Sequence, residues 1–287
     1  MIGYGNSMFL ATHGILARSA STPAFSYLLD TYSGASAAYS LRKLSSTYSG
    51  NCIRVRRSSD NTEQNIGFVN NVLDTASLLS FVGAGNGFVT TWYDQSGNTK
   101  NATQTTAASQ PKIVSSGNLI TTSNGKITVD CYNSSMGNTI VNNSGTAQAV
   151  FSVYQNETTL NASVFALPFG TYNAQGLSGD YFGILQSGSG ASPQSFAGTW
   201  SYYKNGSSTP LTSTRGGLHT GFVNGLISLT STFGTTINGS NNRFIQYSAN
   251  TSFGGNYKVS ESIIYQSNQT TNKTGIETNI NNYWNIY

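Results

Sequence analysis

Charged side chains are scarce in this chain of 287 residues, in which Asp, Glu, Lys and Arg together make up 8% of the sequence. That share is about a third of the usual one. The net charge is +4, and the densest basic cluster consists of Arg54, Arg56 and Arg57. A nucleic-acid-binding protein is expected to carry a broader basic stripe with interleaved aromatic residues. The sequence therefore argues against a nucleic-acid partner.

Residues that bind metals are also few. The chain has two cysteines, Cys52 and Cys131, and two histidines, His13 and His219, which lie far apart in the sequence. No pair or cluster of them has the spacing of a zinc site. We expect the cysteines to be small buried side chains, with a single disulfide as the alternative. The glycine-rich stretch 83–87 follows an expected helix and precedes an expected strand, the reverse of a phosphate-binding loop. We predict no metal and no cofactor.

Long apolar runs are absent too, so the sequence predicts no membrane span. The first residues lack a basic start, and their apolar stretch is short and interrupted, which argues against a signal peptide. Residues 1–25 mix Gly, Met, Phe, Leu and Ile without a clear period. We interpret them as an anchoring arm that docks on a neighbouring protein or adds a strand to the domain. Residues 26–287 are predicted to form that single domain.

The chain is rich in the residues of short strands and polar turns. It contains 31 Gly, 17 Tyr and 14 Phe, together with many Ser, Thr and Asn. This composition predicts a mainly β protein. The expected strands are 52–57, 88–93, 149–154, 163–167, 181–185, 220–223, 244–247 and 257–265, with Asn-Gly turns at 124–125, 205–206, 224–225 and 238–239.

Three short helices are expected beside the strands. Residues 26–48 show a partly apolar helical face. Asp74 is a suitable N-cap for a helix that begins at Thr75. Near the C-terminus the apolar residues follow a helical spacing, and Thr270 or Thr271 would cap that helix. The apolar residues of this C-terminal helix are Ile276, Ile280, Tyr283, Trp284 and Tyr287.

Three stretches, in this order, resemble the catalytic domain of fungal-type α-L-arabinofuranosidase B. The first comprises residues 38–42 and 53–60, and the second comprises residues 91–98 and 101–104. The third is the last expected strand, 260–265. The Tyr-Asp-Gln-Ser-Gly segment 93–97 also resembles that of LamG-like domains. The resemblance covers residues 28–287 and implies a concanavalin A-like (LamG-like) β-sandwich jelly roll with a few short helices. Similar domains occur in bacteriophage virion proteins.

The residues that carry the resemblance are expected to serve the scaffold. Asp94 would form an ion pair with an arginine of the 53–57 strand. The complete set of expected scaffold residues is Arg54, Arg56, Asp60, Trp92, Tyr93, Asp94, Gln95 and Gly97.

The resemblance also implies retaining hydrolysis of terminal arabinofuranose, which needs a nucleophilic carboxylate and an acid/base carboxylate. The stretch that corresponds to the family's nucleophile, 164–185, contains Asp180 as its only acid. The position of the family's acid/base, eleven residues before Glu261, holds Asn250. An amide cannot donate and recover a proton as a carboxyl group does. We therefore expect no catalytic residues, with Asp180 and Glu261 as weak candidates.

The remaining acids have structural explanations. Asp30, Asp60, Asp74 and Asp94 lie in turn or cap contexts, where a carboxylate accepts hydrogen bonds from backbone N–H groups. The glutamates at 63, 157 and 277 are expected to face solvent.

These observations favour a non-enzymatic bacteriophage virion protein: a head or tail decoration, a fibre or an adhesin. Residues 1–25 would dock it on other virion proteins, and the domain would form a homo-oligomer. Exposed Tyr, Trp and Asn side chains would bind host-surface glycans. One alternative is an extracellular glycoside hydrolase of the α-L-arabinofuranosidase type. The other is a purely structural oligomer without a ligand.

Overall fold

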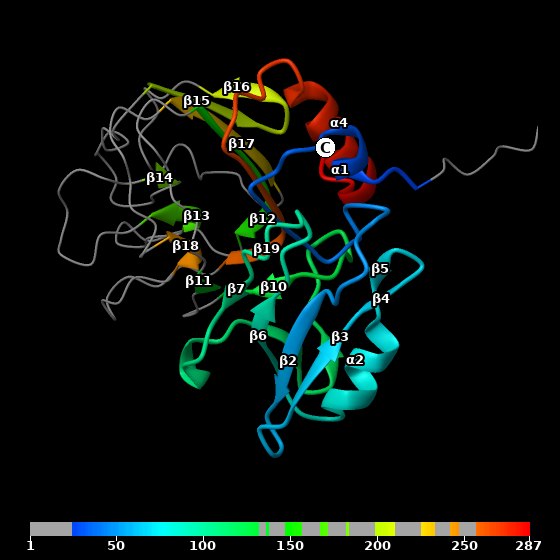
Figure 1. The fold of residues 1–287 in the computed structure, drawn as a ribbon. Helices are drawn as coiled ribbons and strands as arrows, with labels where there is room; N and C mark the ends of the chain where they lie inside the picture. The colour runs from blue at the N-terminus through cyan, green and yellow to red at the C-terminus, as the bar shows by residue number, and fades with distance from the viewer. Residues whose placement is uncertain are drawn as a thin grey trace, which may run out of the picture.

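Antiparallel strands are the main secondary structure of the described residues, and a few helices lie at the edges (Figure 1). The computed structural model describes residues 25–131, 136–137, 147–156, 167–171, 182–183, 199–209, 225–232, 242–246 and 257–287. The expected anchoring arm therefore lies outside the described residues, apart from Phe25. So do the expected strand 220–223 and most of 163–167.

One run of hydrogen-bonded strands contains the longest strands of the described residues. Its order is β1 (Ala37–Ser40), β19 (Tyr257–Tyr265), β12 (Ala147–Asn156), β17 (Gly225–Thr232), β15 (Thr199–Lys204) and β16 (Ser207–Thr209). Residues 149–155 of β12 and 258–265 of β19 are buried without alternation. A strand that is covered on both faces has this pattern, so β12 and β19 lie in the middle of the structure.

A second run lies beside the first and is joined to it by a short strand. Its order is β3 (Glu63–Ile66), β2 (Ile53–Arg57), β6 (Gly87–Trp92), β8 (Lys112–Ser115) and β9 (Asn118–Leu119). The joining strand β10 (Val129–Asp130) pairs with both β8 and β19. This arrangement, mainly β with stacked antiparallel strands, fits a β-sandwich.

Shorter pairings complete the described β-structure. β7 (Ala102–Thr103) pairs with β6 and with β11 (Met136–Gly137), which pairs with β18 (Asn242–Gln246). β18 pairs with β13 (Leu167–Thr171), and β13 with β14 (Phe182–Gly183). The β4 (Phe68–Val69) and β5 (Val72–Leu73) strands form a separate hairpin.

The helices match the sequence predictions at two of three places. α2 (Thr75–Val82) begins after Asp74, whose carboxylate accepts the Ser77 N–H as predicted. α4 (Lys273–Trp284) is the predicted C-terminal helix, but it follows Asn272 instead of a threonine cap. It also ends before Tyr287, which is 53% exposed. A 3-10 turn, η1 (Ala107–Ser109), lies before β8.

The helix predicted over residues 26–48 is wrong for most of its length. Only α1 (Leu28–Thr31) is helical, and the alanine-rich stretch forms β1. All four residues of β1 are buried and pair with Glu261–Ile264 of β19. Burial against β19 therefore overrides the helical preference of alanine.

The core joins the strands to α1 and α4. Trp92 and Tyr39 lie in it with their rings edge to face, 6.5 Å apart. Cys52 and Cys131 are buried and free, so the alternative of a disulfide is wrong. Burial raises the pKa of both thiols well above the ordinary value.

Candidate functional site

The Asp94 side chain holds the loop after β6 in place. Its carboxylate accepts hydrogen bonds from the backbone N–H groups of Ala38 at 2.8 Å, Ser96 at 2.9 Å and Lys100 at 2.9 Å. The Ser96 hydroxyl donates a further bond of 2.8 Å. The expected ion pair between Asp94 and an arginine is therefore wrong, because four uncharged donors saturate the carboxylate.

Gln95 connects the same loop to the segment after β1. Its side-chain oxygen accepts the Leu44 N–H at 2.8 Å. Its side-chain nitrogen donates to the carbonyl oxygens of Ser40 and Arg42, each at 3.0 Å. Gln95 is 2% exposed, so these three bonds satisfy a side chain that water does not reach. Asp94 and Gln95 thus serve the scaffold.

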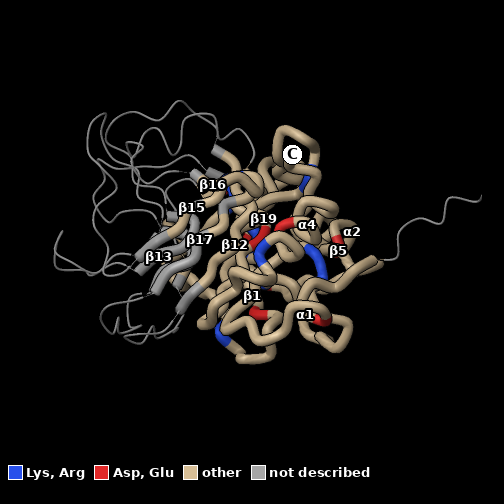
Figure 2. The backbone as a smooth tube through the Cα atoms, turned by 90° about the horizontal axis from the view of Figure 1, so that it is seen from above, with Lys and Arg blue, Asp and Glu red and all other residues tan. Residues whose placement is uncertain are grey.

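The other residues of the resemblance also contact neighbouring parts of the scaffold. Arg54 and Glu63 form an ion pair on the surface, and Arg56 donates to Gln110 and Asn61. The Trp92 ring belongs to the core, whereas the Tyr93 hydroxyl donates to Asn65. Lys, Arg, Asp and Glu are sparse over the molecule, with both signs meeting beside β19 and α4 (Figure 2).

Asp60 closes the turn between β2 and β3. Its carboxylate accepts two hydrogen bonds from the Arg57 guanidinium, at 2.9 and 2.6 Å. The Arg57 guanidinium and the Thr62 backbone N–H hold the pKa of Asp60 well below its usual range. The role of this acid is therefore to form the turn.

Glu261 lies at the centre of a buried polar cluster between β19, β1 and α4. The Arg42 guanidinium donates two hydrogen bonds to its carboxylate, from Nε at 2.8 Å and from Nη2 at 3.0 Å. The Ser40 hydroxyl and the Trp284 indole N–H donate to the same carboxylate at 2.7 and 2.9 Å. Glu261 is 0% exposed. A substrate cannot reach this carboxylate, so the structure assigns Glu261 to the core.

The other described acids also have partners. Asp30 accepts from Ser45 and Ser46, and Asp74 caps α2. Glu277, expected to face solvent, is instead buried and bonded to Lys273 at 2.8 Å. Asp130 lies opposite Lys112 and Lys258 in the neighbouring strands. The sequence-based candidates Asp180, Asn250 and Glu157 lie outside the described residues, as do both histidines.

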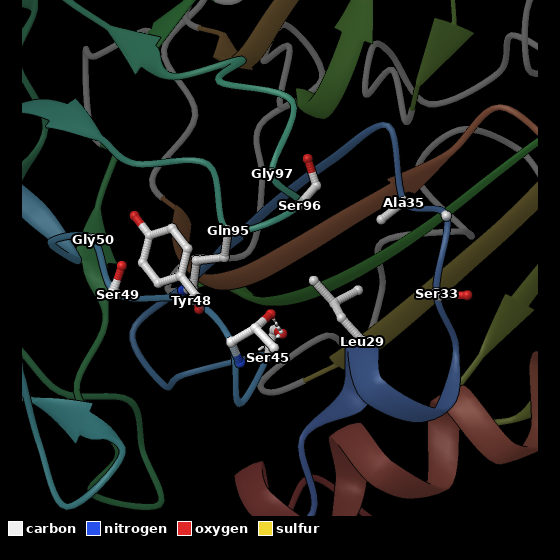
Figure 3. A pocket seen from close by; sticks show the side chains of 12 residues that line it. Leu29, Ser33, Ala35, Ser45, Tyr48, Ser49, Gly50, Gln95, Ser96 and Gly97 are labelled. Atoms are coloured by element: carbon white, nitrogen blue, oxygen red, sulfur yellow. Dashed lines mark hydrogen bonds between the residues drawn. The ribbon is translucent and has the colours of Figure 1, made fainter.

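A pocket of about 310 Å³ opens where α1, residues 45–50 and the loop 95–97 meet. Tyr48 and Ser49 lie on one side, Leu29 and Ala35 on the other, and Ser96 with Gly97 above (Figure 3). Sequence reasoning missed this pocket, because contacts between distant segments form it. The complete lining is Leu29, Ser33, Gly34, Ala35, Ser45, Thr47, Tyr48, Ser49, Gly50, Gln95, Ser96 and Gly97.

The part of the chain that the structure describes contains neither a metal-binding cluster nor a membrane-spanning helix. No group of three or more His, Cys, Asp or Glu side chains there could hold a metal ion. Among the same residues, no helix combines the length and the apolar character that crossing a membrane requires.

The fold is that of known arabinofuranosidases. One similar solved structure is an arabinofuranosidase complexed with arabinofuranosyl-α-1,2-xylobiose, with 15% identity and a TM-score of 0.50. Another is a variant GH54 α-L-arabinofuranosidase soaked with 4-nitrophenyl α-L-arabinofuranoside, with 14% identity and a TM-score of 0.52. In both cases the match covers 88% of this chain and 64% of the other chain.

The sequence identifies the family. The family profile "Alpha-L-arabinofuranosidase B, catalytic" matches residues 30–182, which is more than half of the chain. The chain belongs to this family. No protein of curated function matches it.

The prediction of a non-enzymatic virion protein is wrong. The family profile and the similar structures are those of arabinofuranosidases, and they support the alternative of a glycoside hydrolase. That prediction relied on the absence of a carboxylate at the position of the family's acid/base, where this chain has Asn250, a residue outside the described part of the structure. Docking through residues 1–25, homo-oligomer formation and binding to host-surface glycans remain predictions.

Proposed function

We propose that this chain is a glycoside hydrolase of the α-L-arabinofuranosidase type. It would release terminal arabinofuranosyl units from larger saccharides and act outside the cell, where such polymers are found. The observation that carries the proposal is the family match over residues 30–182. The fold similarity over 88% of the chain supports it.

The proposal requires two carboxyl groups that face the substrate. The sequence contains ten acidic residues. Asp30, Asp60, Glu63, Asp74, Asp94, Asp130, Glu261 and Glu277 lie in the described part, where each has the structural setting given above. The two others are Glu157 and Asp180. By elimination, these two are the acids to test for catalysis.

We propose that the β-sandwich is specifically a concanavalin A-like jelly roll. Two features support it: the described strands pair antiparallel throughout, and β12 and β19 are buried on both faces. A jelly roll places its strands in two such packed sheets.

The test is release of 4-nitrophenol from 4-nitrophenyl α-L-arabinofuranoside. We expect turnover by the native chain and a loss of at least about a hundredfold in Asp180→Asn or Glu157→Gln, the usual minimum effect of losing acid–base catalysis. The control is Glu63→Gln, which removes an acid from an exposed ion pair and should turn over like the native chain. Absence of turnover by the native chain would overturn the proposal.

A further inference from the structure

The pocket beside the 93–97 segment has walls that the fold holds rigidly. The Asp30 carboxylate accepts the Ser46 N–H at 3.0 Å and the Ser45 hydroxyl at 3.0 Å, which fixes the start of the 45–50 segment. Gln95 fixes Leu44 from the other side, and Asp94 fixes Ser96. A site whose walls are already ordered loses little conformational entropy when a ligand binds.

The lining is uncharged. None of its residues is Asp, Glu, Lys, Arg or His. Apolar surface comes from Leu29, Ala35 and the Tyr48 ring, whereas most of the remaining lining carries hydroxyl groups or is glycine. A charged ligand would lose its hydration without gaining a counter-charge there. A purely apolar ligand would cover the Ser49 hydroxyl without giving it a hydrogen-bond partner. The lining therefore suits a neutral molecule with both hydroxyl groups and an apolar face.

The Tyr48 side chain is held in a fixed position at the pocket. Its hydroxyl already donates to the Asn51 carbonyl oxygen at 2.7 Å, and its ring meets the Phe68 ring edge to face. Gly50 makes this position available, because a Cβ atom there would lie 2.5 Å from the Tyr48 hydroxyl oxygen. Ser49, next in the chain, is exposed at the pocket and its hydroxyl has no hydrogen-bond partner among the described residues.

The size of the pocket limits the ligand. About 310 Å³ is at the lower end of the range for small-molecule sites, about 300–1,000 Å³. A ring or two of a sugar matches this size, with hydroxyl groups at its edge and C–H groups on its face. An aromatic side chain such as Tyr48 presents the matching apolar surface.

We propose that this pocket binds a neutral mono- or disaccharide unit without cleaving it. Cleavage is excluded at this place because no carboxylate lines the pocket, and glycoside hydrolysis by this family's chemistry needs two. The inference goes beyond the proposed hydrolase function and does not depend on it, since no step uses a catalytic acid.

The experiment is calorimetric titration of the full chain with xylobiose. This probe carries no arabinofuranosyl unit, so the proposed hydrolase activity cannot consume it, and its binding is measured whether or not the chain is an enzyme. We expect saturable binding by the native chain. Ser49→Trp should weaken binding by at least about tenfold, because the indole would fill the pocket.

A matched variant keeps the test interpretable. Ser80→Trp introduces the same indole on α2, at an exposed residue that does not line the pocket, and should bind like the native chain. Absence of binding by the native chain, or unchanged binding by Ser49→Trp, would overturn the proposal.

Discussion

Replacing Glu261 by Gln tests whether this acid is structural. The native carboxylate accepts four hydrogen bonds, two of them from Arg42, and both side chains are nearly inaccessible to water, at 0% and 2% exposed. The amide would remove the negative charge and present N–H donors to groups that are themselves donors. Arg42 would then remain in the core without a counter-charge.

The expected cost follows from this geometry. Breaking a buried ion pair by removing one partner costs about 3–5 kcal/mol. The Tyr283 ring, whose centroid is 5.0 Å from the Arg42 guanidinium, retains part of the stabilisation. We therefore expect Glu261→Gln to lower the free energy of unfolding by about 3 kcal/mol.

Equilibrium unfolding in urea measures this loss, with Glu63→Gln as the matched control. The Glu63–Arg54 pair has side chains that are 34% and 41% exposed, so its loss should cost at most about 1 kcal/mol. If Glu261→Gln kept native stability but abolished turnover, Glu261 would be catalytic and our assignment would be refuted.

Further predictions concern the loop, the thiols and alkaline pH. Asp94→Asn should lower the free energy of unfolding by about 2–3 kcal/mol, because its amide nitrogen would face N–H donors. Equilibrium unfolding in urea measures this change, and a decrease below about 0.5 kcal/mol would contradict the prediction. Cys52 and Cys131 should not react with a thiol reagent in the native protein and both should react in urea; rapid native labelling would be inconsistent with their burial. Burial raises the pKa of Tyr283 to about 12. The unfolded chain therefore ionises first, and stability should fall as the pH rises from about 10 to 12; a flat profile there would count against a buried phenol.

Local signals in the sequence predicted several elements well. The alternation in 52–57 predicted β2, and the aromatic, β-branched run 88–93 predicted β6. Asp74 predicted the start of α2, and apolar spacing predicted α4. In each case the stabilising pattern lies within a few residues of sequence.

The rest depends on contacts between distant residues. The preference of alanine for helices hid β1, whose pairing with β19 spans more than 200 residues. Glu261 could not be assigned to the core from the sequence, because its partner Arg42 is 219 residues away. Asp94 was expected to form an ion pair with an arginine, but its carboxylate instead accepts hydrogen bonds from backbone N–H groups of β1 and of its own loop. Residues from three separate segments line the pocket, so no short sequence motif marks it.

Product analysis with arabinofuranosyl-α-1,2-xylobiose tests the proposed hydrolase activity most directly. We expect arabinose and xylobiose in equal amounts, with the anomeric configuration of arabinose retained in its first-formed product, as followed by proton NMR. An unchanged trisaccharide after prolonged incubation with folded native protein would contradict it.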